Sequence, residues 1–116
     1  MIITPISDLT TESLQVALHG VDEARQAHQA NIANLETPGY LAQKVSFQDS
    51  LSKALTDGAP GEAHITTARS TAATNMNGNN VSADSEMVGF TENTLTNQLL
   101  TEALSAKYRL LRAALS

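Results

Sequence analysis

The sequence predicts a mainly α-helical chain with a long helix at each end, joined by a tight turn, a short helix and a flexible middle loop. Apolar residues recur at helical spacing over both terminal thirds, turn residues cluster at 38–39, and the middle is rich in Gly, Ala, Ser, Thr and Asn. With 116 residues, two Phe, two Tyr and no Trp, the chain has room for one domain with an aliphatic core. A deep catalytic cavity is not expected.

The N-terminal helix is expected over residues 8–34. Asp8 or Thr10 suits the N-cap, and Glu12 places a carboxylate in the first turn, where the helix dipole favours it. Positions that alternate in steps of three and four residues keep one side of a helix against a partner. They are Leu14, Ala17, Val21, Ala24, His28 and Asn31. Gly20 lies within this row and is expected to weaken the isolated helix by ~1 kcal/mol relative to Ala.

Residues 35–56 are expected to hold a tight turn and a short helix. Asn34 suits the left-handed position that ends a helix, and Pro38 and Gly39 supply the central residues of a type II turn. The amides of Asn31 and Asn34, three residues apart on one face, are placed to tie the last helical turn to the loop. Taken alone, a capped helix end and a turn explain this stretch, and a binding role is the less favoured alternative.

The short helix follows directly. Ser46 and Asp49 resemble a capping box, while Phe47, Leu51 and Leu55 recur every four residues until Gly58 ends the run. Residues 57–81 then form a variable surface loop, in which Ile65 and Met76 are the large apolar residues. This loop cannot build its own core, so it is expected to be flexible unless a neighbour covers it, with at most one short strand near residues 63–67.

The C-terminal helix is expected over residues 82–115, with Ser82 as N-cap. Asp84 and Glu86 lie in the first turn and Lys107, Arg109 and Arg112 near the end, so both ends complement the helix dipole. Its seam is Met87, Phe90, Thr94, Asn97, Thr101, Leu104, Tyr108, Leu111 and Leu115, and a flanking row is Leu95, Leu99, Ala103, Ala106 and Leu110. This width predicts burial against more than one neighbour.

Charge and composition disfavour several function classes. The net charge of −5 argues against nucleic acid as a partner, and the absence of Cys removes disulfides and thiolate chemistry. No signal peptide and no direct membrane insertion are expected, because no apolar run is long enough. His19, His28 and His64 do not have metal-site spacing, so surface or seam positions are expected instead. No catalytic residues, metal or cofactor are predicted, and an enzyme is the least favoured class.

Residues 31–40, Asn-Ile-Ala-Asn-Leu-Glu-Thr-Pro-Gly-Tyr, resemble the N-I-A-N-x-x-T-P-G-Y signature of flagellar rod, hook and hook-associated axial proteins. Val45 and Phe47 match the V-x-F that follows it, whereas Leu41 stands where the family usually carries Lys. Residues 78–87 resemble the proximal-rod pattern G-N-x-V-x-x-x-x-E-M, and residues 107–115 resemble the last helix of that branch. The chain is therefore similar to the basal-body rod protein family, in its proximal-rod, FlgB-like branch.

The resemblance implies a single axial-protein domain, residues 1–116, whose terminal helices pair antiparallel as a coiled-coil-like hairpin. It implies a structural subunit of the hollow, periplasm-spanning rod that transmits torque, exported without a cleavable signal peptide. The implied partners are copies of itself, other rod proteins, the flagellar type III export apparatus and the rod-base junction protein. The alternative is a soluble helical adaptor that binds a partner coiled coil.

Three groups of site residues follow. The family motif is Asn31, Ile32, Ala33, Asn34, Thr37, Pro38, Gly39, Tyr40, Val45 and Phe47. Export-gate recognition is assigned to Phe47 and Leu51, by their resemblance to the Phe-x-x-x-apolar element of rod and hook subunits, although helix packing alone also explains that pair. Subunit packing is assigned to Leu14, Leu18, Val21, Met87, Phe90, Leu104, Tyr108, Leu111 and Leu115.

Overall fold

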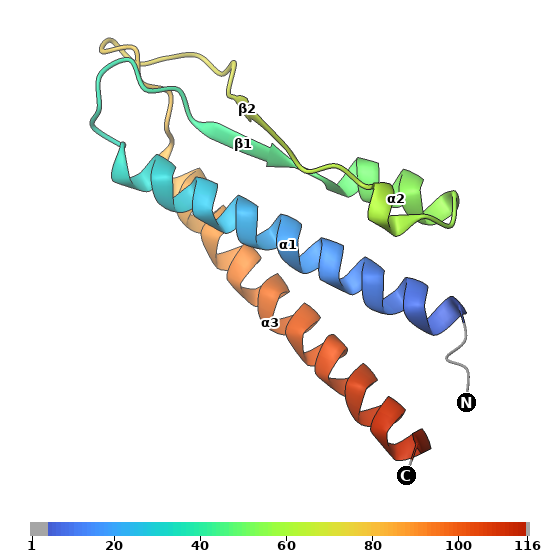
Figure 1. Cartoon of the computed structure of the whole chain (residues 1–116). Helices are drawn as coiled ribbons and strands as arrows, with labels where there is room; N and C mark the ends of the chain where they lie inside the picture. Colours follow the sequence, from blue (N-terminus) through green and yellow to red (C-terminus); the bar gives the residue numbers. More distant parts are fainter. Residues whose placement is uncertain (1–4, 116) are drawn as a thin grey trace.

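A computed structural model describes residues 5–115 and shows two long antiparallel helices with an arm of short elements between them in sequence (Figure 1). Helix α1 spans Pro5–Ala33 and helix α3 spans Ala83–Leu115. The molecule is long and flat, with extents of 62 × 26 × 14 Å. The predicted mainly α-helical hairpin is confirmed.

Helix α1 begins earlier than the sequence predicted. It starts at Pro5, so Asp8 and Thr10 lie inside the helix and the prediction that one of them is the N-cap is wrong. Proline suits the first turn of a helix, because its fixed φ is already helical and its missing N–H would have no partner there. The helix ends at Ala33, one residue before the predicted end.

Helix α3 begins as predicted. Ser82 precedes its first residue, and the Ser82 hydroxyl accepts a hydrogen bond from the Ser85 N–H at 3.4 Å. The Ser82 carbonyl accepts from the Glu86 N–H at 2.9 Å. The predicted N-cap is confirmed, with Asp84 and Glu86 in the first turn and Arg112 in the last.

The arm contains more regular structure than the sequence predicted. It comprises strand β1 (Gln43–Ser46), helix α2 (Gln48–Thr56), the 3₁₀ helix η1 (Pro60–Glu62) and strand β2 (Thr66–Arg69). The strands pair antiparallel, with Gln43 opposite Arg69 and Ser46 opposite Thr66. Strand β1 was not predicted, and β2 begins three residues after the expected position.

The predicted end of helix α2 before Gly58 is confirmed, but the predicted cap at its start is wrong. Its N-cap is Phe47, without a side-chain hydrogen bond, and Ser46 belongs to β1, so the capping box is wrong. At the other end Gly58 has a φ of 73°. Its N–H donates to the Leu55 carbonyl at 3.0 Å, and the Ala59 N–H donates to the Ala54 carbonyl at 2.8 Å. These two bonds form the Schellman motif that a glycine at this position allows.

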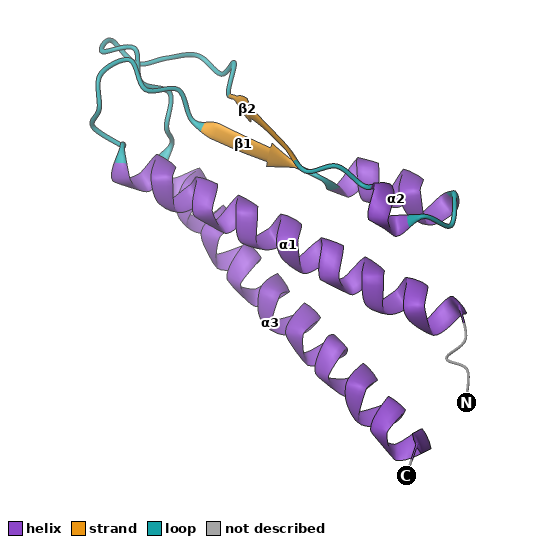
Figure 2. Ribbon diagram, in the orientation of Figure 1, coloured by secondary structure: helices purple, strands orange, loops and turns teal. Residues whose placement is uncertain are grey.

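Helix α1 lies between α3 on one side and the arm on the other (Figure 2). The buried apolar side chains are few and mostly small: Val21, Ala27, Ala42, Phe47, Ala54 and Val81. Phe47 packs against Gly20 of α1, where a Cβ atom would come within 2.5 Å of the Phe47 Cγ. Gly20 therefore creates the space in α1 that the single buried aromatic ring of this arm occupies.

The side of α3 that is half-buried differs in part from the predicted seam. Phe90, Thr94, Asn97, Leu104 and Leu111 are half-buried as expected, but Met87, Thr101, Tyr108 and Leu115 are exposed. Asn93 and Leu100, which the prediction omitted, are half-buried too. The Thr94 hydroxyl donates to its own helix, to the Phe90 carbonyl at 2.9 Å. No helix among the described residues is long and apolar enough to span a membrane.

Candidate functional site

The motif of residues 31–40 begins at the end of α1. The Asn34 N–H donates to the carbonyls of Ala30 at 3.1 Å and Asn31 at 3.2 Å, and the Leu35 N–H donates to Ile32 at 3.2 Å. The last turn therefore tightens toward 3₁₀ geometry. No non-glycine residue among those described has a positive φ, so the prediction of a left-handed Asn34 is wrong. The Asn34 side chain instead donates to the Ala30 carbonyl at 2.8 Å.

Pro38 and Gly39 form the predicted type II turn. Gly39 has a φ of 72°, and the Tyr40 N–H donates to the Thr37 carbonyl at 3.3 Å. This hydrogen bond and the positive φ at the third residue define the turn, and glycine adopts that φ without steric cost. The Thr37 hydroxyl also donates to the Asn34 side-chain oxygen at 3.1 Å, so the turn is held to the helix end.

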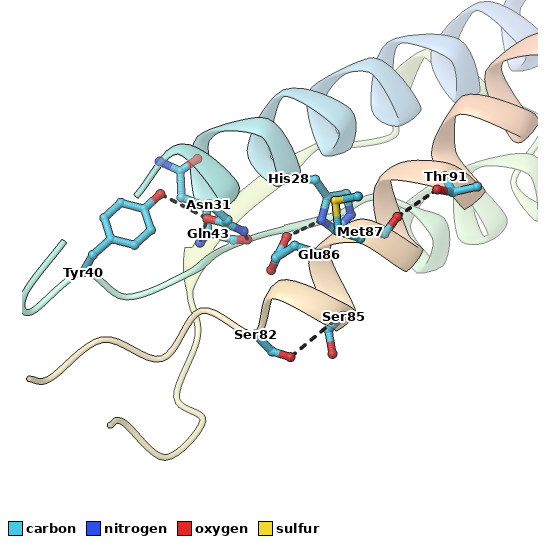
Figure 3. A network of polar contacts seen from close by, with 9 residues as sticks. All are labelled: His28, Asn31, Tyr40, Gln43, Ser82, Ser85, Glu86, Met87 and Thr91. Atoms are coloured by element: carbon cyan, nitrogen blue, oxygen red, sulfur yellow. Dashed lines mark hydrogen bonds and ion pairs between the residues drawn. The ribbon is translucent and has the colours of Figure 1, made fainter. Parts of the chain in front are cut away.

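Asn31 joins the helix to the segment that leaves the turn (Figure 3). Its side chain is fully buried. The side-chain oxygen accepts from the Gln43 N–H at 2.8 Å and from the Tyr40 hydroxyl at 3.0 Å, and the side-chain nitrogen donates to the Gln43 carbonyl at 3.0 Å. The Asn31 amide thus pairs with the backbone of β1 as a neighbouring strand would. The predicted tie between the last helical turn and the loop is confirmed.

Asn79, just before α3, reaches back to the same corner. Its side chain is fully buried, and its nitrogen donates to the carbonyls of Asn34 at 2.9 Å and Thr37 at 2.8 Å. Its side-chain oxygen accepts from the Val81 N–H at 2.8 Å. One side chain therefore satisfies backbone groups at the exit of α1 and at the approach to α3.

Asn80 makes a second set of bonds across the same junction. Its side-chain oxygen accepts from the Ala42 N–H at 2.7 Å, and its nitrogen donates to the carbonyls of Ser70 and Ala72, both at 3.1 Å. Its own N–H donates to the Tyr40 carbonyl at 3.2 Å. Asn80 therefore joins the turn to Ala42, directly before β1, and to the chain that leaves β2.

Two glycines allow these segments to approach closely. The Gly39 N–H donates to the Asn77 carbonyl at 2.9 Å. Gly78 has a φ of 83°, and a Cβ atom there would lie 3.2 Å from the Gly39 Cα. We call residues 31–43 and 77–82 together the corner clasp. It brings the two sequence patterns, 31–40 and 78–87, into one hydrogen-bonded unit.

A contact between His28 and Glu86 links the two long helices beside the corner clasp (Figure 3). His28 Nδ1 of α1 lies 2.5 Å from Glu86 Oε2 of α3, and Glu86 is 8% exposed. The His28 ring also lies against Gly89, where a Cβ atom would come 2.6 Å from the imidazole Cε1. The seam position expected for His28 is confirmed, and His19 and His64 are exposed. Among the described side chains, no cluster of three His, Asp or Glu residues is placed to hold a metal ion.

The other predicted site residues fall into distinct environments. Ile32, Tyr40 and Val45 are half-buried and Ala33 is exposed. Arg69 of β2 lies over the Tyr40 ring, 5.3 Å from its centroid. In the assigned export element, Phe47 is buried at 6% exposure and Leu51 is half-buried. Of the assigned packing residues, Val21 is buried, Leu14, Leu18, Phe90, Leu104 and Leu111 are half-buried, and Met87, Tyr108 and Leu115 are exposed.

The structure also shows functions for residues that the sequence did not assign. Asn79 stood in the second pattern without a role, and Glu86 was expected only to complement the helix dipole. Asn80 was placed in the loop, and Gly20 was expected only to weaken its helix. The run of three residues from Gly78 to Asn80 was the available signal, because Gly and Asn together mark a tight backbone path. The partners that tie Asn79 and Asn80 to residues 34–42 lie far away in sequence.

Comparisons with known proteins agree with the two patterns. No protein-family model matches the chain. The flagellar basal body rod protein FlgB of Bacillus subtilis (strain 168) is 30% identical over 120 residues, which cover 92% of this chain and 93% of that protein. The similarity therefore includes both long helices and the arm between them.

Proposed function

The chain belongs to the FlgB-like family of flagellar basal-body rod proteins, and on that premise we propose that it is a structural subunit of the proximal rod. In this proposal the terminal helices assemble into the hollow shaft that crosses the periplasm and transmits torque. The partners are further copies of the chain and other rod proteins. Its proposed role is structural rather than catalytic.

The observation that carries this proposal is the incomplete burial of α3. Leu104 and Leu111 are only half-buried within the chain, while Leu95, Leu99, Leu110 and Leu115 are more than half exposed. An isolated soluble chain rarely exposes apolar surface of this extent along one helix. Packing against neighbouring subunits would bury it, and contacts that repeat head to tail without closing generate a helical filament.

The corner clasp supports the same proposal from the other end of the hairpin. It fixes where the chain leaves α1 and where it enters α3, through buried amides and close glycine contacts. A subunit that transmits torque needs a fixed orientation of its two long helices relative to each other. The motif of residues 31–40 would then serve assembly indirectly, by holding the packing helices in place.

Export would precede assembly in this proposal. The chain would reach the rod through the flagellar type III apparatus without a cleavable signal peptide, and join the rod-base junction protein. Phe47 and Leu51 would be recognised by the export gate. Phe47 is buried in the folded chain, so its recognition would require the unfolded chain, and packing against Gly20 would follow after export.

Substitutions in the α3 seam test the proposal. Leu111→Asp and Leu104→Asp place a carboxylate where a neighbouring helix is expected, so we expect no rods and no swimming in a host that lacks the natural copy. Rods are counted by electron microscopy of isolated basal bodies. Ser52→Asp, which adds the same charge on the exposed face of α2, should leave rods normal.

Two controls separate assembly from folding and export. Leu111 lies near the end of α3, where the two helices have diverged (Figure 1), so circular dichroism of the purified Leu111→Asp variant should match the natural chain. The exported amount should match as well. Normal rods built from Leu111→Asp would refute packing through this seam.

A further inference from the structure

Asn77 is the one asparagine in the sequence that is followed by glycine. Asparagine is among the chemically labile residues of proteins. The backbone nitrogen of the next residue attacks its side-chain amide, and glycine lets the two groups approach because it has no Cβ atom. Asn77 is exposed and begins the second segment of the corner clasp. Asn75 is exposed in the same loop, but a methionine follows it.

The Asn77 side chain is folded back along the chain. Its side-chain oxygen accepts a hydrogen bond from the Asn79 N–H at 3.1 Å. This Asx turn holds the amide group beside the peptide bond that joins Asn77 to Gly78. The same hydrogen bond would stabilise negative charge on the oxygen during attack on the amide carbon. The side chain therefore stays near the nitrogen that would attack it.

Two backbone hydrogen bonds oppose that attack in the folded chain. The Asn77 carbonyl accepts from the Gly39 N–H at 2.9 Å, and the Gly78 N–H donates to the Asn75 carbonyl at 2.9 Å. The first bond fixes the orientation of the peptide between Asn77 and Gly78. The second keeps the proton on the nitrogen, which attacks only after losing it. Reaction therefore requires this part of the corner clasp to open.

We propose that Asn77 is a deamidation site that reacts only when the corner clasp is open. The Gly78 nitrogen loses its proton to solvent and forms a bond to the Asn77 side-chain amide carbon. The bond from that carbon to the side-chain nitrogen breaks, and ammonia leaves after taking up a proton. Water then opens the cyclic imide at either of its carbonyl groups, and no atom is oxidised or reduced. The products are an aspartyl residue and an isoaspartyl residue.

The isoaspartyl product prevents the clasp from closing again. Its main chain runs through the former side chain and so has an extra carbon atom before Gly78. Space for that atom is short, because a Cβ atom on Gly78 would already lie 3.2 Å from the Gly39 Cα. The added length also displaces Asn79, whose buried nitrogen donates to the Asn34 and Thr37 carbonyls. The aspartyl product keeps the natural chain length and the side-chain oxygen, so it closes normally.

This reaction goes beyond the proposed place in the rod and does not rest on it, because its readout is the covalent structure of the chain. A folded chain protects Asn77, whereas a chain that stays unfolded exposes it. An isoaspartyl chain has lost the hydrogen bonds that hold the exit of α1 to the approach to α3. Deamidation therefore marks chains that have remained unfolded.

The natural chain tests the protection without any substitution. It is incubated in mildly alkaline buffer over a urea series, and peptide mapping at low pH measures the deamidated fraction at Asn77 and at Asn75. A reaction that passes through an open state follows the population of that state. The rate at Asn77 should rise at least about tenfold across the unfolding transition seen by circular dichroism. The rate at Asn75 should stay low throughout.

Three variants test the site and the clasp separately. In fully denaturing urea, Gly78→Ala should slow the reaction of Asn77 to the rate of Asn75, whatever its effect on the fold. Without urea, Asn79→Ala should raise the rate at Asn77 at least about tenfold, which corresponds to 1.4 kcal/mol. Asn75→Ala removes an exposed amide of the same loop and should leave that rate within about twofold of the natural value.

The products test the consequence for folding. Isoaspartyl chains are separated from aspartyl chains by reversed-phase chromatography and refolded. They should unfold at a lower urea concentration than the natural chain, whereas Asn77→Asp, which reproduces the aspartyl product, should unfold near the natural midpoint.

Three results would overturn the proposal. Equal rates at Asn77 in folded and unfolded chains would show that the corner clasp does not protect it. Equal rates at Asn77 and Asn75 in unfolded chains would show that Asn77 is not a distinct site. Isoaspartyl chains that unfold at the natural midpoint would refute the block on closing.

Discussion

At the scale of single residues, three asparagine side chains take the place of backbone partners in the corner clasp. Asn31 pairs with both backbone groups of Gln43, and Asn79 joins the exit of α1 to the approach to α3. Asn80 joins the turn to the residue directly before β1. Buried backbone groups in a tight corner lack helix or strand partners, and leaving them unpaired is costly. Short amides can both donate and accept, so they satisfy such groups in pairs.

Asn79→Ala is the sharpest test at this scale. The change leaves the Asn34 and Thr37 carbonyls and the Val81 N–H without their side-chain partner, in a fully buried position. We expect the free energy of unfolding to fall by about 2–3 kcal/mol in urea titrations. Asn75→Ala removes an exposed amide from the same loop and should change stability by less than about 0.5 kcal/mol. Equal losses for the two variants would refute the role of Asn79.

The sequence predicted the contacts in this corner between residues that are close in sequence, but not those between residues far apart. The type II turn and the bonds of Asn31 depend on neighbours within about a dozen residues, and both were predicted correctly. Asn79 and Asn80 also bind residues 38 to 45 positions away, which no local pattern indicates. Asn34 was placed in the wrong conformation because its side chain bonds to its own helix, so the helix ends without a left-handed residue.

At the scale of elements, long helices were predictable and short strands were not. Both long helices have periodic apolar residues over many turns, and the Ser82 cap fixes the start of α3. Strand β1 has four residues, and its inner edge is completed by the side chain of Asn31 rather than by a third strand. Tertiary contacts stabilise β1, and the strand propensities of its residues do not predict such contacts.

Substitutions at Phe47 and Gly20 can distinguish two roles of Phe47, which are packing on α1 and proposed recognition by the export gate. Phe47→Ala removes the buried ring and should reduce both stability and secretion, because the ring both packs on α1 and belongs to the proposed export element. Gly20→Ala adds a Cβ atom within 2.5 Å of the Phe47 Cγ, so it should destabilise the fold by about 1–3 kcal/mol. It leaves residues 47–51 unchanged.

Secretion of the two variants is compared by immunoblot of culture medium and cells. We expect Phe47→Ala to be secreted less than the natural chain and Gly20→Ala to be secreted normally. Because export uses the unfolded chain, a loss of packing alone should not lower secretion. Equal secretion of Phe47→Ala and the natural chain would leave Phe47 with a packing role only.

At the scale of the whole molecule, the chain is a thin, elongated hairpin with few large side chains in its core. Helix α1 is covered on two sides, while α3 is covered on one. The sequence predicted that α3 has more apolar surface than one neighbour can bury. It identified the side that faces α1 only in part, because Phe90, Asn97 and Leu104 are half-buried as predicted, while Asn93 and Leu100, which the predicted seam omits, are half-buried too. The corner clasp determines which side of α3 turns toward α1, and the spacing of apolar residues does not describe the clasp.

The most direct test of the proposed function is electron cryo-microscopy of flagellar basal bodies purified from the natural host. We expect the chain at the proximal end of the rod, with α1 and α3 packed against neighbouring subunits, the exposed leucines of α3 buried, and the corner clasp unchanged. Basal bodies with complete rods that do not contain this chain would contradict the proposal.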